Sequence, residues 1–130
     1  MIVDSSAILA ILLVEPEARR IAQAIAAKAG PRLPASCYLE VSITLLARHR
    51  DDGLRELDLF IAAAEMEVAS FAESQAKLAR DAFRRYGKGR HPAGLNFGDC
   101  MAYALAKETG EELLFKGTDF GLTDVAVAPY

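Results

Sequence analysis

Cysteine, histidine and tryptophan are nearly missing from this chain. It has two cysteines, two histidines and no tryptophan among its 130 residues. Cys37 and Cys100 lie far apart and form no CxxC motif, so we expect two reduced, buried thiols rather than a disulfide framework. Since only His49 and His91 remain to join them, a zinc site is not expected either.

The chain also lacks a hydrophobic run that could cross a membrane. The apolar stretch Ala7–Val14 is far shorter than the roughly 20 residues that a spanning helix needs. Asp4 precedes it and no basic region does, so it does not have the form of a signal peptide. We therefore predict a cytoplasmic protein with no membrane partner, in which this stretch is a buried helix.

An excess of positive charge is missing too, because the formal net charge is −3. A polycationic nucleic-acid-binding protein is therefore excluded, and any contact with nucleic acid must come from a local basic patch. One segment, Lys77–His91, has this character, with Asp81 as its single acid. Its basic residues are Lys77, Arg80, Arg84, Arg85, Lys88 and Arg90.

What the chain does contain is a regular alternation of short apolar runs with helical segments. With 52% hydrophobic residues it can form a core without disulfides or metal. The expected strands are Met1–Asp4, Pro31–Ser36, Met66–Ala69, Leu113–Phe115 and Val125–Ala128. Such alternation is typical of a parallel sheet covered by helices on both faces. We predict one α/β domain over residues 1–130, with three layers and about five strands.

Local signals place the ends of the predicted helices. Ser36 and Asn96 are suited to cap the helices that follow them. Ser70 and Glu73 have the spacing of a capping box, and Asp51–Gly53 is expected to break a long helical region. The expected helices are 7–14, 16–30, 37–50, 54–65, 70–86 and 96–110.

Four carboxylates stand in unusual positions. Asp4 ends the first predicted strand, and Asp119 follows the strand that ends at Phe115. Glu40 lies in a helix that is apolar on almost every side, and Asp99 opens another apolar helix. Sites in open parallel sheets form outside the carboxyl ends of the strands, which is where Asp4 and Asp119 fall.

Each of these acids also has an ordinary structural explanation. Asp4 is placed to cap the next helix, and Asp99 lies in a first turn, where the helix dipole favours an acid. Considered by itself, Asp119 is best explained as a turn residue. Glu40 has no Lys or Arg three or four positions away, so its ordinary explanation is a distant salt bridge or an exposed edge.

Taken together, the four acids favour a cation site. Two carboxylates about 4 Å apart repel each other by roughly 4 kcal/mol at an effective dielectric constant near 20. A cluster of them is unfavourable unless protons or a cation offset the repulsion. A site rich in oxygen ligands and poor in histidine suits Mg²⁺ or Mn²⁺, which activate water for attack on phosphate esters.

The same segments carry a family resemblance. They are Met1–Ala7, Ser36–Glu40, Gly94–Ala104 and Leu113–Phe120. In this order, over essentially the whole chain, the pattern resembles the PIN-domain family, and within it the VapC-type toxins of type II toxin–antitoxin pairs. The resemblance implies a twisted parallel sheet and an endoribonuclease that depends on Mg²⁺ or Mn²⁺.

The resemblance also implies roles for particular residues. Asp4 and Asp99 match the family's two firmest metal ligands, Glu40 the third acid, and Ser6 the hydroxyl residue that supports the first acid. Many members have a further acid where this chain has Gly117. In spite of this departure, Asp119 is expected to serve as the fourth catalytic acid, with Asp124 as the alternative.

Partners follow from the resemblance as well. It implies a homodimer, a VapB-type antitoxin and a structured RNA substrate, with transfer RNA as the leading expectation. The residues expected to contact RNA are Arg84, Arg85, Lys88, Arg90 and His91, although a helix face of this kind is often merely solvated. Two alternatives stay open: another metal-dependent phosphoesterase, and a catalytically inactive PIN-like module that binds RNA or protein.

Overall fold

Four short parallel strands form the centre of the protein, and the computed structural model describes all 130 residues. The sheet order is β3-β2-β1-β4. The elements are β1 (Ile2–Val3), α1 (Ser5–Leu12), α2 (Ala18–Ala26), β2 (Arg32–Pro34), α3 (Ala35–Ala63), β3 (Glu67–Ala69), α4 (Glu73–Tyr86), α5 (Phe97–Thr109), β4 (Leu113–Leu114) and the 3-10 helix η1 (Asp119–Leu122). The predicted α/β class with a parallel sheet is confirmed.

The fifth predicted strand is reduced to a single bridge. Val127 pairs in parallel with Leu113, on the side of β4 away from β1. Leu113 donates its N–H to the carbonyl of Ala126 at 2.8 Å, and Ala128 donates to the carbonyl of Leu113 at 2.9 Å. The segment therefore covers the edge of the sheet, although too few residues pair to count as a strand.

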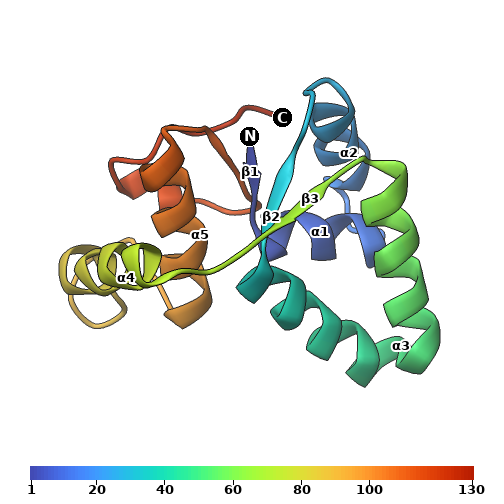
Figure 1. Ribbon diagram of the computed structural model, residues 1–130, viewed down its shortest axis with the longest axis horizontal. Coiled ribbons are helices and arrows are strands. Elements are labelled where there is room, and N and C mark those ends of the chain that lie inside the picture. Colours follow the sequence, from blue (N-terminus) through green and yellow to red (C-terminus); the bar gives the residue numbers. More distant parts are fainter.

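Helices cover both faces of the sheet, as Figure 1 shows. On one side α5 packs directly against β1, β2 and β4, and α4 lies along α5. On the other side lie α1, α2 and the second half of α3. The inner strand β1 and its neighbour β4 are wholly apolar and buried, and Ile2, Leu33 and Leu113 are completely buried.

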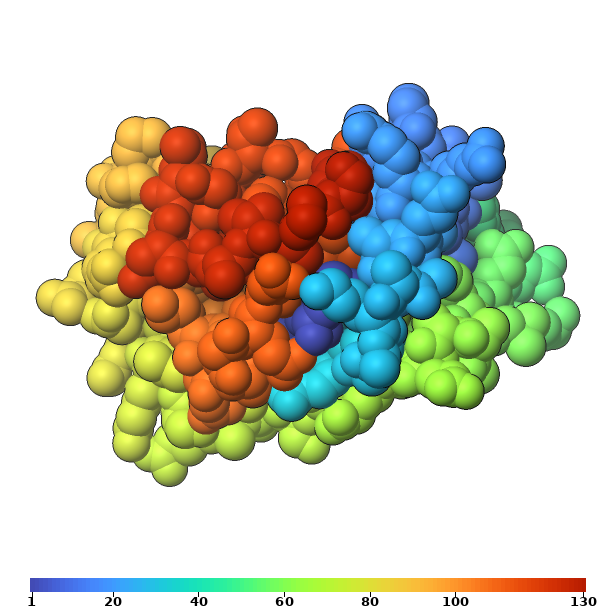
Figure 2. Space-filling model, turned by 90° about the horizontal axis from the view of Figure 1, so that it is seen from above, coloured from blue at the N-terminus to red at the C-terminus, as the bar shows by residue number.

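Charged pairs lie at the end of the sheet where the strands begin. Figure 2 looks onto this end and shows the start of the chain, in dark blue, recessed between segments near β2 and β4. Arg32 lies 3.3 Å from Glu111, and Lys28 lies 3.2 Å from Glu112. These pairs stabilise the end of the sheet that lies farthest from the carboxyl ends of its strands.

Both predicted ends of α5 are confirmed, whereas α2 ends at Ala26 rather than near Gly30, and two predicted serine caps are absent. Asn96 caps α5 through a capping box with Asp99, and Gly110 ends the helix with φ at 70°. Ser36, in contrast, lies inside α3, which starts after Pro34 without a side-chain cap. Ser70 makes no capping box, because α4 starts at Glu73 after Ala72. Both serine motifs fitted a helix start, but β2 ends at Pro34, before Ser36, and three residues separate the end of β3 from the start of α4.

The long helix α3 is bent at Arg50 rather than at the predicted Asp51–Gly53. Arg50 has φ 57° and ψ −146°, a region that residues other than glycine rarely adopt. Gly53 then lies so close to the first half of the helix that an added Cβ would come within 2.9 Å of the Leu45 carbonyl oxygen. The bend returns the chain toward β3 and gives α3 its V shape in Figure 1.

No helix in the structure is long and apolar enough to cross a membrane.

We predict that Arg50→Gly stabilises the protein. Relief of backbone strain of roughly 1–3 kcal/mol exceeds the entropic cost of a glycine, so the free energy of unfolding should rise by about 1 kcal/mol. Urea unfolding measures the change. Arg48→Gly is the matched control, because a glycine within the regular helix should lower the same quantity by about 1 kcal/mol. A loss of stability in Arg50→Gly would contradict the strained bend.

A candidate metal site at the carboxyl ends of the strands

The strand order creates a crevice beside the end of β1. The chain moves from β1 to β2 and β3 on one side, and then returns through α4 and α5 to place β4 on the other side of β1. Loops leaving β1 and β4 therefore diverge, which is where open α/β sheets form their sites. Asp4 follows β1 directly, and Asp119 lies in η1 after β4.

Asp4 is a buried carboxylate without a cationic partner. Only 2% of the residue is exposed, and it forms no ion pair. It caps α1: its Oδ2 accepts from the Ser6 N–H at 2.9 Å and from the Ser6 hydroxyl at 2.6 Å. Burial raises the pKa of Asp4 to about 6, although the Ser6 hydrogen bonds oppose the shift. The expected capping role is thus real, but it leaves the negative charge uncompensated.

Ser6 connects Asp4 to the neighbouring strand. While its hydroxyl donates to Asp4, its oxygen accepts the backbone N–H of Lys116 at 3.0 Å. Lys116 follows β4, so one side chain joins the ends of the two strands that flank the crevice. The predicted supporting position of Ser6 agrees with this geometry.

Glu40 reaches the same region from the second turn of α3. It is half-buried and has no ion pair, so neither a distant salt bridge nor an exposed edge accounts for it. Its Oε2 accepts from the Ser5 hydroxyl at 2.6 Å. The sequence interpretation overlooked Ser5, because its only visible signal was a serine suited to start α1.

Asp99 lies in the first turn of α5 and completes the capping box with Asn96. Its Oδ2 accepts from the Asn96 N–H at 2.8 Å. Burial raises the pKa of Asp99, and the charges of Glu40 and Asp119 raise it further, against the lowering effect of that hydrogen bond. The Asp99 side chain therefore both caps α5 and belongs to the acidic cluster.

The four predicted acids influence one another electrostatically. The charges of Asp99 and Glu40 raise the pKa of Asp4, in addition to burial, and Asp119 acts in the same way on Asp99. Asp119 itself is exposed. No three carboxylate, thiol or imidazole side chains are placed so that together they could hold one ion. The arrangement suits a hydrated ion held by one or two carboxylates, as Mg²⁺ commonly is.

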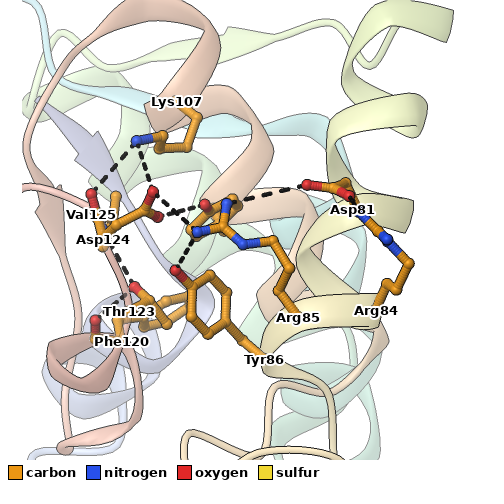
Figure 3. Close-up of polar contacts among 10 residues, drawn as sticks. Asp81, Arg84, Arg85, Tyr86, Lys107, Phe120, Thr123, Asp124 and Val125 are labelled. Carbon is orange, nitrogen blue, oxygen red and sulfur yellow. Dashed lines mark hydrogen bonds and ion pairs between the residues drawn. The ribbon is translucent and has the colours of Figure 1, made fainter.

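Asp124, the alternative fourth acid, belongs to a different network, shown in Figure 3. Tyr103 donates its hydroxyl to Asp124 at 2.5 Å, and Lys107 and Arg85 approach the same carboxylate at 3.3 and 3.5 Å. These contacts keep the pKa of Asp124 below its usual value. Asp124 therefore joins the C-terminal segment to α4 and α5, while Asp119 is the acid whose charge acts on Asp99.

The basic segment divides into paired and free residues. Arg84 pairs with Asp81 at 2.6 Å, and Arg85 with Asp124, so both guanidinium groups have internal partners. Lys88 and Arg90 are exposed and form no ion pair. They lie in a loop closed by hydrogen bonds between Lys88 and Leu95 and between Leu95 and Tyr86.

His91 has a structural contact within this loop. Its Nδ1 accepts from the Ala93 N–H at 3.1 Å, and its ring packs edge-on against Tyr86 with centroids 5.2 Å apart. Tyr86 is itself buried, which agrees with a packing role. The loop ends at Asn96, the cap of the helix that carries Asp99. The loop that carries Lys88 and Arg90 therefore leads along the chain to Asp99.

Comparison with known proteins agrees with this architecture. A family model described as "PIN domain" matches residues 1–126. Ribonuclease VapC of Mycolicibacterium smegmatis is 48% identical over 126 residues, which cover 97% of this chain and 98% of that protein. Ribonuclease VapC28 of Mycobacterium tuberculosis is 50% identical over 126 residues, covering 96% and 95%.

Solved structures show the same fold at much lower identity. VapC20 of Mycobacterium tuberculosis, described as a sarcin–ricin loop cleaving toxin, has a TM-score of 0.79 at 14% identity and covers 98% of both chains. VapBC2 from Rickettsia felis, solved with promoter DNA, has a TM-score of 0.72 at 12% identity and covers 97% and 95%. The chain belongs to the PIN-domain family and, within it, to the VapC group, as its sequence pattern predicted.

We predict that Asp4→Asn stabilises the isolated protein at neutral pH. The pKa of Asp4 is higher in the folded protein than in the unfolded chain, so the folded state binds this proton more tightly. The free energy of unfolding therefore falls as the pH rises from about 4 to about 6, and it stays at this lower value above pH 6. The asparagine side chain of the variant carries no charge, so the gain at pH 7.5 should be roughly 2–3 kcal/mol.

Urea unfolding in EDTA measures this gain, which should nearly vanish as the pH falls below the unfolded-state pKa of 3.8, where Asp4 becomes protonated in both states. Asp119→Asn is the control, because that carboxylate is exposed and its removal should change little. Equal stability of wild type and Asp4→Asn at pH 7.5 would mean that the buried charge is compensated after all.

Proposed function

We propose that the protein is an endoribonuclease that depends on Mg²⁺ or Mn²⁺ and acts as the toxin of a type II toxin–antitoxin pair. The observation that carries the proposal is the buried Asp4 carboxylate, which has no cationic partner and lies in one electrostatic cluster with Glu40 and Asp99. The ribonuclease names of relatives at 48% and 50% identity support it. The two free cysteines are consistent with a cytoplasmic location.

The donor set fits a hard divalent cation. All four acids offer oxygen ligands, and both histidines take part in other contacts, His49 with Glu56 and His91 within its loop. Asp4 and Asp99 would hold the ion, while Glu40 and Asp119 would add negative charge and accept hydrogen bonds from its waters. When bound, such an ion makes hydroxide available from water near neutral pH and offsets charge on the phosphate.

The protein's own residues would position this chemistry. Ser6 holds the Asp4 carboxylate in one orientation through its N–H and hydroxyl, and the Lys116 N–H in turn holds Ser6. Asn96 fixes Asp99 in the same way through its backbone N–H. Ser5 holds Glu40. Orientation of ligands by such outer contacts commonly contributes roughly 10- to 100-fold to metal affinity or activity.

The substrate is proposed to be structured RNA, with transfer RNA as the leading class. Its phosphates would contact Lys88 and Arg90 in the loop that leads to Asp99, and this contact would offset the overall net charge of −3. His91 would support the loop through its contact with Ala93, whereas Arg84 and Arg85 would contribute less to RNA contact, because each is paired with an acid.

The first experiment is cleavage of end-labelled total RNA with Mg²⁺ or Mn²⁺. We expect discrete cuts that EDTA abolishes, and an Asp99→Asn variant at least about 100-fold slower, because loss of a ligand should exceed loss of an outer contact. Asp119→Asn should also cleave more slowly. Asp124→Asn is the control, since it removes the network in Figure 3 and should lower stability without changing the rate at saturating metal.

Absence of cleavage by folded protein free of antitoxin, across several RNA classes, would sink the ribonuclease proposal. Metal binding by calorimetry would then separate the alternatives. A protein that binds Mn²⁺ and cleaves DNA or phosphate monoesters instead would be another metal-dependent phosphoesterase. One that binds no metal would be a PIN-like binding module.

We predict that Lys88→Ala with Arg90→Ala weakens RNA binding in a manner that depends on salt. Each phosphate contact releases counterions, so the slope of log affinity against log salt should become shallower by about 1.5. Filter binding of an uncleavable complex, made with Asp99→Asn, measures the slope. Arg19→Ala with Arg48→Ala removes two charges from α2 and α3 and is the control. Identical slopes for the two double variants would exclude the loop as the contact.

The proposal includes two protein partners, a second copy of the chain and a VapB-type antitoxin. A hollow of about 820 Å³ adjoins Glu40 and is lined by Leu39, Ile43, Phe71 and Phe97. All four are exposed, and Phe97 is 80% exposed. Apolar surface of this extent commonly marks a protein contact. Light scattering of the purified chain, alone and with antitoxin, tests both assemblies.

A further inference from the structure

Gly98 is crowded by one functional group only. It is the second residue of α5 and directly precedes Asp99. A Cβ added there would lie 2.8 Å from Oε2, 3.2 Å from Cδ and 3.2 Å from Oε1 of Glu40. All three nearest atoms therefore belong to a single carboxyl group, which approaches the backbone of α5 more closely than any side chain at position 98 would permit.

The backbone at this position does not itself require glycine. Gly110 and Gly117 have positive φ, whereas Gly98 has ordinary helical geometry. Gly53 and Gly87 are also crowded, but their nearest neighbours are backbone carbonyl oxygens, so they serve the packing of the chain. Because glycine is a poor helix former, its presence in a first turn calls for a local reason. The Glu40 carboxylate is that reason.

Ser5 holds the same carboxylate through its hydroxyl. Ser5 is buried, and its hydroxyl donates to Glu40 Oε2 at 2.6 Å. Glu40 is thus in contact with two other elements: α1, which supplies a donor, and α5, which supplies space. No cation contacts it, so these contacts decide where its charge lies.

We propose that Gly98 and Ser5 are positioning residues that act through Glu40, holding its carboxylate against the start of α5 where it faces Asp99. This inference rests on the proposed metal-dependent function. A side chain at position 98 would displace the carboxylate and remove one negative group from the cation's surroundings. Neither residue contacts substrate or metal.

The test compares Gly98→Ala with Gly121→Ala, by Mn²⁺ titration followed by electron paramagnetic resonance and by thermal unfolding. We expect Gly98→Ala to weaken Mn²⁺ binding by about 10-fold or more, within the range for outer contacts. Its unfolding temperature should be no lower than that of wild type, because alanine favours a helix. Gly121 has no atom within 4 Å of an added Cβ and no positive φ, so Gly121→Ala should bind as wild type does.

A double-mutant cycle separates positioning from general damage to α5. If Gly98→Ala acts only through the Glu40 carboxylate, it should change Mn²⁺ affinity by less than about 2-fold in a Glu40→Ala background. Ser5→Ala should weaken binding in wild type and have a similarly small effect in that background. An equally large loss in both backgrounds would overturn the proposal.

The controls also separate this inference from the proposed function. If wild type binds Mn²⁺ and cleaves RNA while Gly98→Ala matches it, only the positioning role fails. If wild type neither binds Mn²⁺ nor cleaves RNA, the function itself fails, and the positioning role fails with it. Weaker binding accompanied by a large drop in unfolding temperature would show a structural role instead and would count against the proposal.

Discussion

The buried carboxylate of Asp4 is the constraint to which the surrounding structure is fitted. A carboxylate in this position loses most of its hydration, and no Lys or Arg contacts it. The Ser6 N–H and hydroxyl offset part of that loss, and Ser6 in turn joins the end of β1 to the segment after β4. The same hydrogen bonds that support the charge therefore also connect the two strands at the point where the sheet order reverses.

Several features of this region lower the stability of the folded protein and place negative charges close together. Glu40 and Asp99 add negative charge beside the buried Asp4. Burial raises the pKa of both aspartates, and the charge of Glu40 raises both further. Glycine at position 98 has low helix propensity, but it leaves the space in which Glu40 approaches α5. Such an arrangement is unfavourable for folding alone, and a cation bound to the folded state, as proposed, would offset that penalty.

Charged groups away from the cluster have different tasks. Arg85, Tyr103 and Lys107 surround Asp124 and hold the C-terminal segment against α4 and α5 (Figure 3). Lys88 and Arg90 stay free of such partners in the loop before α5. A chain with net negative charge thereby keeps two exposed cations in the loop that leads along the chain to Asp99, and such local positive charge suits contact with a polyanion.

The sequence alone determined the alternation of strands and helices, the caps of α5 and the four acids, because each depends on residues close together in the chain. The caps at Ser36 and Ser70 were mispredicted, and the break in α3 was predicted correctly but placed one to three residues late, since packing decides where a helix starts or bends. The tertiary structure alone separated Asp119 from Asp124 and joined Ser5, Glu40 and Gly98. Those contacts connect α1, α3 and α5 across long sequence separations, and no local pattern encodes a distance between elements that only folding brings together.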